Sequence, residues 1–147
     1  QCSSQVGLIT RFKNFSMLCP NEREIRIALQ EKELGLEALS HELIDATGTK
    51  MLLIKLGSEG LIVYDRNAQG NLISQAFPAL STNPLDVTGA GDSVLAIMSA
   101  GLSCKVPTMH CGALSSCMSA LAVEQMGNSP ISMYALEQKV RSVFNNR

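Results

Sequence analysis

The 147-residue sequence lacks tryptophan and contains only four phenylalanines and two tyrosines. Proteins that bind single-stranded nucleic acid stack bases on aromatic side chains, and this composition does not indicate such a platform. An excess of charge of one sign is also missing, because 12 basic residues are balanced by 13 acidic ones. We therefore expect no broad electrostatic surface for nucleic acid.

Long apolar runs are absent as well. No run reaches the roughly 18 residues that a membrane-spanning helix needs, and no secretory signal peptide is visible. The cysteines are odd in number and form no CxxC pair, which argues against a zinc site or a disulfide framework. We expect a cytoplasmic protein without membrane contact. We also expect most of its five cysteines to behave as small apolar residues; they are Cys2, Cys19, Cys104, Cys111 and Cys117.

The sequence contains enough apolar residues to form one hydrophobic core. Hydrophobic residues make up 46% of the chain, and this length favours a single domain. Segments with apolar residues at helical spacing alternate with short continuous apolar runs, and this alternation is typical of an α/β layered fold. The pattern predicts strands at 14–19, 51–54, 61–64 and 72–77, and helices at 22–35, 36–48, 92–102, 109–126 and 131–144.

Two nearby glycines, Gly89 and Gly91, stand where a loop enters a predicted helix. Glycine frees the backbone to turn its N–H groups toward one point, and a helix start adds unpaired donors and a positive dipole end. This combination favours an anion such as a phosphoryl group.

Three interpretations of Asp92 compete. It can be the cap of the following helix, or the glycines can belong to a dinucleotide fingerprint, although Val94 occupies the position where that fingerprint needs glycine. In the third interpretation, Asp92 accepts the proton of an attacking hydroxyl beside the anion site. The sequence contains no Gly-x4-Gly-Lys-[Ser/Thr] run, so a P-loop enzyme is excluded.

Three motifs then occur in one order along the chain. They are Asn21-Glu22-Arg23-Glu24, Lys55-Leu56-Gly57-Ser58-Glu59-Gly60 and Asp86-Val87-Thr88-Gly89-Ala90-Gly91-Asp92. Together they resemble the Asn-x-x-Glu motif, the nucleotide-site turn and the C-terminal Asp-Thr-x-Gly-Ala-Gly-Asp motif of the ribokinase, or PfkB, carbohydrate kinases. Val87 replaces the usual Thr, a mild departure because both residues are β-branched.

The resemblance implies ATP-dependent phosphorylation of a sugar or sugar-phosphate hydroxyl. It makes Asp92 the general base and Gly89, Ala90 and Gly91 the anion hole. It makes Asn21 and Glu24 the pair that organises Mg²⁺ through water, a role compatible with the alternative of a helix cap and a first-turn acid.

The resemblance also assigns the nucleotide site and a second cation. Contacts to ATP are implied for Lys55, Gly57, Ser58 and Gly60, and a wall beside adenine for Gly112 to Ser116. Lys55 departs from the family's frequent Thr, so a solvated strand-end lysine is the alternative there. For Gly112 and Ser116 the alternative is ordinary helix packing.

Asp86 and Thr88 match positions that hold a monovalent cation such as K⁺ in some members, with backbone carbonyls around Ala122, Gln125 and Gly127. The alternative for Asp86 is a turn residue that bonds its own backbone.

We interpret residues 1–147 as the C-terminal portion of a ribokinase-like layered fold, with a parallel-rich sheet flanked by helices. This portion would be the nucleotide-binding and catalytic part. The N-terminal sugar-binding part and lid of the family are absent, and the chain opens at Gln1 rather than Met. We expect this fragment to bind ATP weakly and to phosphorylate no sugar alone. A homodimer of the full-length protein is compatible with the resemblance.

The opening residues resemble heptose-phosphate kinases, which favours a sugar phosphate as substrate. A catalytically dead nucleotide-binding or regulatory module is the alternative function.

Overall fold

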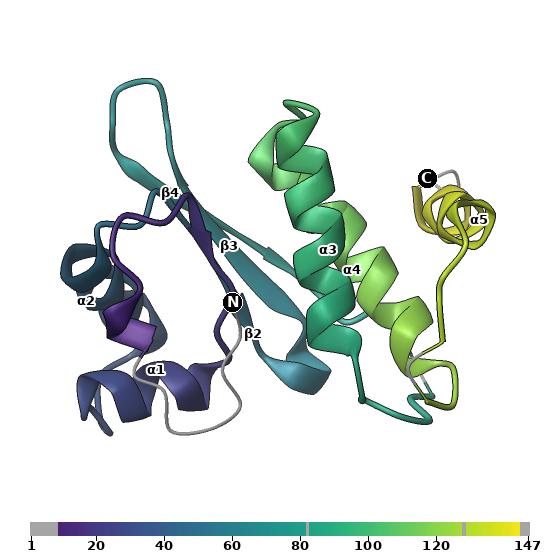
Figure 1. Cartoon of the computed structure of the whole chain (residues 1–147), viewed down its shortest axis with the longest axis horizontal. Helices are drawn as coiled ribbons and strands as arrows, with labels where there is room; N and C mark the ends of the chain where they lie inside the picture. Colours follow the sequence, from purple (N-terminus) through teal and green to yellow (C-terminus); the bar gives the residue numbers. More distant parts are fainter. Residues whose placement is uncertain (1–8, 82, 128, 145–147) are drawn as a thin grey trace. The chain divides into compact units, whose positions relative to one another are not determined.

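The computed structural model describes residues 9–81, 83–127 and 129–144. These residues divide into two compact units. The first contains residues 9–56 and 61–76, and the second contains residues 57–60 and 77–144. Figure 1 labels most of the helices and strands of both units.

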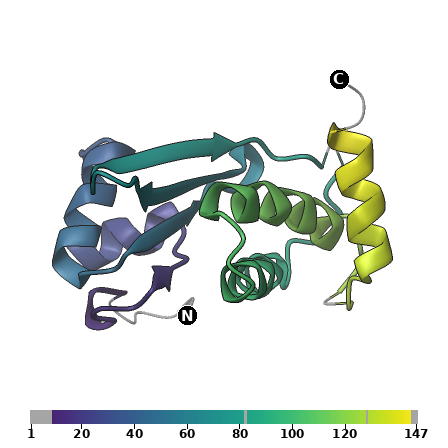
Figure 2. The same ribbon diagram turned by 90° about the horizontal axis from the view of Figure 1, so that it is seen from above.

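A four-stranded sheet has the order β1 (Met17–Leu18), β2 (Met51–Lys55), β3 (Leu61–Arg66) and β4 (Leu72–Phe77). β1 pairs with β2 in parallel, and β2 pairs with β3 antiparallel. The second pairing is antiparallel because a short glycine-containing turn reverses the chain between the two strands. The predicted α/β fold is confirmed, but the sheet is mixed instead of parallel-rich, because the antiparallel pair β2–β3 lies beside the parallel pair β1–β2. Figure 2 shows β3 and β4 along their length.

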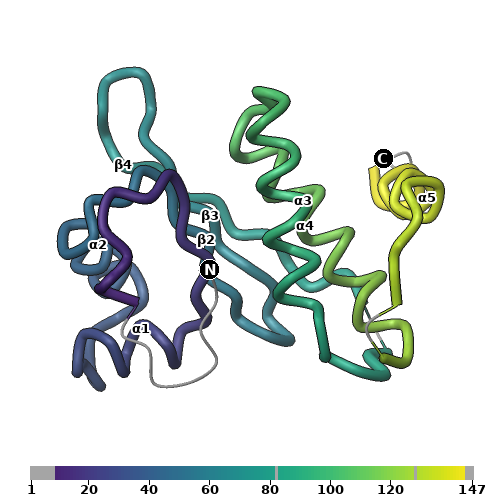
Figure 3. Tube along the Cα trace, viewed as in Figure 1, coloured from purple at the N-terminus to yellow at the C-terminus, as the bar shows by residue number. Residues whose placement is uncertain are grey.

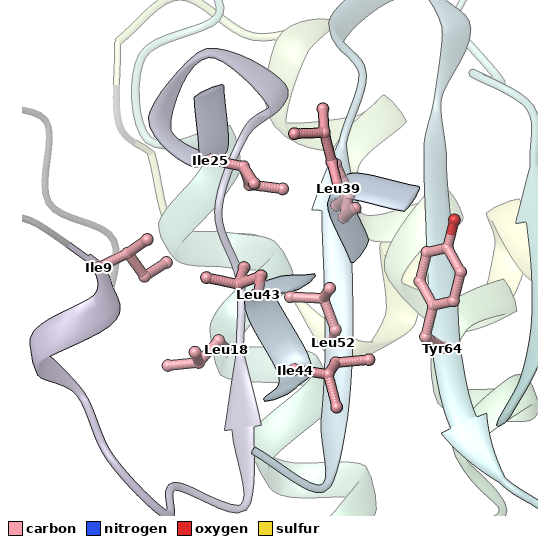
Figure 4. Close-up of a cluster of buried hydrophobic side chains, with 9 residues drawn as sticks. Ile9, Leu18, Ile25, Leu39, Leu43, Ile44, Leu52 and Tyr64 are labelled. Atoms are coloured by element: carbon pink, nitrogen blue, oxygen red, sulfur yellow. The ribbon is translucent and has the colours of Figure 1, made fainter. Parts of the chain in front are cut away.

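The core of the first unit lies between the sheet and two helices, α1 (Glu22–Leu29) and α2 (Leu36–Thr47). A short 3-10 turn, η1 (Ile9–Arg11), adds Ile9 to it. Apolar residues at helical spacing in α2 (Leu39, Leu43 and Ile44) and alternate residues of β2 (Leu52 and Ile54) belong to this core. Figure 4 shows this cluster of buried side chains: Ile9, Leu18, Ile25, Leu39, Leu43, Ile44, Leu52 and Tyr64.

The ends of these helices have local causes. Asn21 caps α1 as predicted, and α2 ends at Gly48, whose φ of 68° suits glycine. The prediction that α1 runs to Gly35 is wrong, since the helix ends at Leu29. There Gln30 takes a left-handed φ of 58°, and its amide donates to carbonyls of the last turn.

The second unit contains α3 (Ala90–Ser103), α4 (Thr108–Val123) and α5 (Met133–Phe144). Figure 3 shows α3 and α4 side by side. Small residues allow this approach: a Cβ on Gly101 would lie 2.6 Å from the sulfur of Cys111. The prediction that α4 continues to Met126 is wrong, because the helix ends at Val123 and Gly127 lies beyond its cap, Glu124.

Three of the described cysteines lie in the interior of the protein. Cys19, Cys111 and Cys117 are buried free thiols, as expected, whereas Cys104 is exposed. Cys2 lies outside the described residues. Within the described ranges, no helix has the length and apolar character needed to cross a membrane.

Candidate functional site

The glycine-rich segment lies at the start of α3. Gly89 is the N-cap, with φ 78° and ψ −7°, a left-handed conformation that a side chain disfavours. Ala90, Gly91 and Asp92 are therefore the first three residues of the helix. The interpretation of Asp92 as the helix cap is wrong, because that position belongs to Gly89.

The backbone amides at the start of α3 differ in whether they donate a hydrogen bond to a backbone carbonyl. The amide of Ser93 donates to the Gly89 carbonyl at 3.0 Å, and that of Ala90 to the Val87 carbonyl at 3.3 Å. For Gly91 and Asp92, no backbone acceptor is found among the residues that the structure describes. These two amides point out of the first turn of the helix, and the Asp92 residue beside them is exposed.

The loop before Gly89 is tied to the end of α4 through Asp86. One carboxylate oxygen of Asp86 accepts the amide of Thr88 at 2.9 Å, and the other accepts the amide of Gly127 at 3.0 Å. The carbonyl of Val123 accepts the amides of Leu85 and Asp86 at 2.7 and 3.2 Å. The hydrogen bond from Thr88 is the main reason that the pKa of Asp86 is lowered, and the bond from Gly127 adds to it.

The turn between β2 and β3 belongs to the second unit. Its 3-10 turn, η2 (Gly57–Glu59), is exposed and is followed by Gly60, whose φ is 101°. A Cβ on Gly60 would overlap the Phe77 carbonyl oxygen and would lie 2.7 Å from the backbone of both Pro78 and Ala79. Glycine is therefore needed here, because the turn packs directly on the backbone of 77–79.

Helix α4 contacts the same segment. The Ser116 hydroxyl donates to the Pro78 carbonyl at 2.6 Å, and Gly112 is buried one turn earlier. The second unit thus brings the predicted turn and the predicted adenine wall to one backbone segment. Sequence reasoning missed Pro78, because a backbone carbonyl leaves no signal in the identity of its residue.

Asn21, Glu24 and Lys55 belong to the first unit. Asn21 and Glu24 form a capping box, in which each side chain accepts the other residue's amide at 2.8 Å. The Lys55 amide donates to the Pro20 carbonyl at 2.9 Å, and Lys55 bridges to Asn21 as a parallel strand neighbour. All three residues therefore gather at the start of α1.

The other predicted site residues belong to the second unit. They are Gly57, Ser58, Gly60, Asp86, Thr88, Gly89, Ala90, Gly91, Asp92, Gly112 and Ser116. Comparison with known proteins shows to which family the chain belongs. The model of the pfkB family of carbohydrate kinases matches residues 7–133. The chain belongs to the pfkB family.

Relatives of this pfkB chain include bifunctional HldE proteins. That of Campylobacter curvus is 27% identical over 139 residues, which are 92% of this chain and 28% of that protein. That of Pelobacter propionicus is 29% identical over 126 residues, 83% of this chain and 25% of that protein. The chain therefore spans about a quarter of the length of these relatives.

Solved structures show the same fold. Ribokinase from Thermotoga maritima has a TM-score of 0.74 at 23% identity, over 86% of this chain and 42% of that one. Phosphofructokinase-2 from Escherichia coli, solved in complex with potassium, has a TM-score of 0.80 at 17% identity, over 97% of this chain and 46% of that one. The predicted ribokinase-like fold is confirmed.

Two of the predicted site residues, Glu24 and Asp86, have carboxylate oxygens of the kind that binds cations. In the capping box, Glu24 uses Oε2 for the Asn21 amide, which leaves Oε1 outside the box. Asp86 places a carboxylate beside the carbonyl-rich end of α4. Oxygen donors of this kind suit Mg²⁺ and K⁺ rather than softer metals. Among the described residues no cluster of three or more His, Cys, Asp or Glu side chains could hold a metal ion.

Proposed function

We propose that this chain is the C-terminal nucleotide-binding and catalytic part of a kinase that transfers a phosphoryl group from ATP to a hydroxyl of a sugar or sugar phosphate. The observation that carries the proposal is the start of α3. Gly89 caps the helix, the amides of Gly91 and Asp92 have no backbone acceptor among the described residues, and Asp92 is exposed. Donors for developing negative charge and an acceptor for a proton thus share one helix end.

In the proposed step, the Asp92 carboxylate takes the proton of the attacking hydroxyl. The hydroxyl oxygen forms a bond to the γ-phosphorus while the bond from phosphorus to the bridging oxygen of ADP breaks. The amides of Gly91 and Asp92 stabilise charge on the transferring group. Of the predicted anion hole, Gly89 and Ala90 form the helix start that presents these amides, and the Ala90 amide itself donates to the Val87 carbonyl. The helix dipole favours the same charge.

We assign most of the nucleotide site to the second unit. The ribose and phosphates of ATP are assigned to the exposed turn of Gly57, Ser58 and Gly60. Lys55, which belongs to the first unit, precedes this turn in the sequence at the end of β2. The adenine is assigned to the side of α4 that carries Gly112 and Ser116. The packing of Gly60 on 77–79 and the bond from Ser116 to Pro78 support a shared site.

Two cations accompany this reaction in our proposal. Mg²⁺, when bound, would offset the charge of the ATP phosphates, and Asn21 and Glu24 would hold it through water. Asp86 and Thr88 would hold K⁺ beside the glycine loop. The carboxylate of Asp86 already fixes that loop to the end of α4, so a cation there would reinforce an existing contact.

We propose a sugar phosphate as the acceptor, because the opening residues resemble heptose-phosphate kinases. The sugar-binding residues would lie outside this chain, which spans under half of the solved kinases. The alternative is a nucleotide-binding or regulatory module without catalysis. Asp92 argues against it, because a module that only binds phosphate gains nothing from an exposed carboxylate beside the anion site.

Calorimetric titration of the chain with ATP and with NAD tests the proposal. We expect weak binding of ATP that strengthens with Mg²⁺, and no heat from NAD. A phosphorylation assay with the same chain should show no transfer to sugars. Binding of NAD in preference to ATP would contradict the proposed kinase, and robust sugar phosphorylation would contradict the division of the site.

A further inference from the structure

Ser116 directs its hydroxyl away from its own helix. It is 5% exposed, and its Oγ donates at 2.6 Å to the carbonyl of Pro78, 38 residues earlier in the chain. The adjacent Ser115 behaves differently, because its buried hydroxyl donates to the Cys111 carbonyl one turn back in the same helix at 2.8 Å. Such back-bonding is the common behaviour of serine within a helix, so the contact of Ser116 is a specific link between two segments.

The segment that Ser116 holds carries the glycine turn. Gly60 lies directly against the backbone of Phe77, Pro78 and Ala79, with no room for a Cβ. Its amide also closes the turn, donating to the Gly57 carbonyl at 3.2 Å. A movement of the Pro78 carbonyl would therefore displace the surface on which the turn rests. Close-packed backbone transmits such shifts, because it has no void to absorb them.

We propose that Ser116 is a positioning residue for the nucleotide turn: through the Pro78 carbonyl it holds residues 57–60 in the conformation that receives the phosphates. The proposal rests on the proposed function, and it changes the role that the sequence suggested for Ser116. The hydroxyl acts on Pro78 instead of on adenine. Its effect on the nucleotide therefore passes through Pro78 and Gly60.

Removing the hydroxyl takes away the side-chain partner of the Pro78 carbonyl at a partly buried contact. Loss of one neutral hydrogen bond corresponds to a factor of roughly three to ten in an equilibrium constant. We expect Ser116→Ala to weaken ATP binding by about that factor. We also expect faster amide exchange at residues 57–60, because the turn loses its support.

The matched control is Ser115→Ala, which removes a buried hydroxyl and leaves the Pro78 contact intact. Adjacent residues of a helix face different sides, so Ser115 does not share the side of α4, that of Gly112 and Ser116, to which adenine is assigned. Ser116→Thr, which keeps the donor, is the conservative variant. We would measure the Kd of each variant for Mg²⁺-ATP by calorimetry, and the hydrogen exchange of residues 57–60 without nucleotide. Thermal unfolding of the two alanine variants shows whether their global stabilities match.

The proposal expects weaker binding and faster turn exchange in Ser116→Ala, with Ser115→Ala unchanged in both and Ser116→Thr closer to the wild type. Equal behaviour of the two alanine variants in exchange and in Kd would overturn it. If no variant binds ATP but Ser116→Ala still exchanges faster, the proposed function fails and the nucleotide role of Ser116 fails with it. The exchange measurement therefore separates the two failures.

Discussion

The carboxylate of Asp86 accepts the amide of Gly127 at 3.0 Å, which joins residues 41 positions apart. Its other oxygen accepts the amide of Thr88 at 2.9 Å. One side chain thus fixes the loop that leads to Gly89 and attaches it to the chain beyond α4. Together with the amides of Leu85 and Asp86 that donate to the Val123 carbonyl, this side chain fixes the loop that precedes α3 and Asp92.

Replacing Asp86 with asparagine should loosen this contact. The amide group can accept one of the two N–H groups, but its own NH₂ then faces the other donor. The folded-state pKa of Asp86 is lowered by its hydrogen bonds, so its contribution is complete above the ordinary aspartate pKa of about 3.9 and is lost as pH falls through the lowered value.

Urea unfolding in potassium-free buffer, from pH 7 to pH 3, checks this prediction. We expect Asp86→Asn to be less stable than the wild type at pH 7 and the difference to shrink at the acid end. A difference that stays constant or widens toward low pH would contradict the role of the Asp86 carboxylate.

The variant Glu24→Gln distinguishes the role of Glu24 in capping α1 from its proposed role in holding Mg²⁺. Glutamine can complete the same capping box, so the free energy of unfolding should stay near that of the wild type, whereas Asn21→Ala should lose about 1 kcal/mol. If Glu24 organises Mg²⁺, Glu24→Gln should slow phosphoryl transfer in the full-length protein most at limiting Mg²⁺. A transfer rate unchanged across the Mg²⁺ titration would limit Glu24 to capping.

Gly60→Ala should destabilise the protein more than Gly57→Ala does. Both glycines have positive φ, but a Cβ at Gly57 meets nothing within 4 Å, whereas at Gly60 it meets the backbone of 77–79. The strain of positive φ costs about 1 kcal/mol at either position, and overpacking adds about 1–3 kcal/mol at Gly60. Denaturant unfolding of both variants measures the difference, and equal losses would show that the turn does not rest on 77–79.

The thiols should differ in reactivity. Cys104 is exposed, whereas Cys111 and Cys117 are buried, and burial raises the pKa of both buried thiols. The thiolate is the reactive form, so at pH 8 a maleimide reagent should label Cys104 before Cys111 and Cys117, and this buried pair only on unfolding. Mass spectrometry of timed samples gives the order, and early labelling of Cys111 would contradict the packing of α3 on α4.

Much of the fold could be predicted from the sequence where one residue type decides the local backbone. Asn21 predicted the start of α1 through its side-chain acceptor, and Gly48 predicted the end of α2 through its left-handed conformation. The end of α1 could not be predicted, because Gln30 adopts a left-handed φ that glycine usually takes. There the helix end is stabilised by the carbonyls of Arg26 and Ile27, which accept the Gln30 amide, and not by a residue type that favours this conformation.

The candidate site shows the same division. Its glycines and Asp92 form a motif, so they could be identified before the structure. The engagement of the Ala90 amide by Val87 and the bond from Ser116 to Pro78 could not, since both involve backbone carbonyls. Carbonyl groups are common to all residues, and only the folded chain shows which of them are used.

The most direct test of the proposed kinase is Asp92→Asn in the full-length protein. Asparagine keeps the size of the side chain but cannot take the proton of the attacking hydroxyl at neutral pH. The account predicts a fall in the rate of phosphoryl transfer of roughly 10²–10⁴-fold, with the Kd for Mg²⁺-ATP almost unchanged. Near-normal turnover in this variant would contradict the account, because Asp92 would then not be the base.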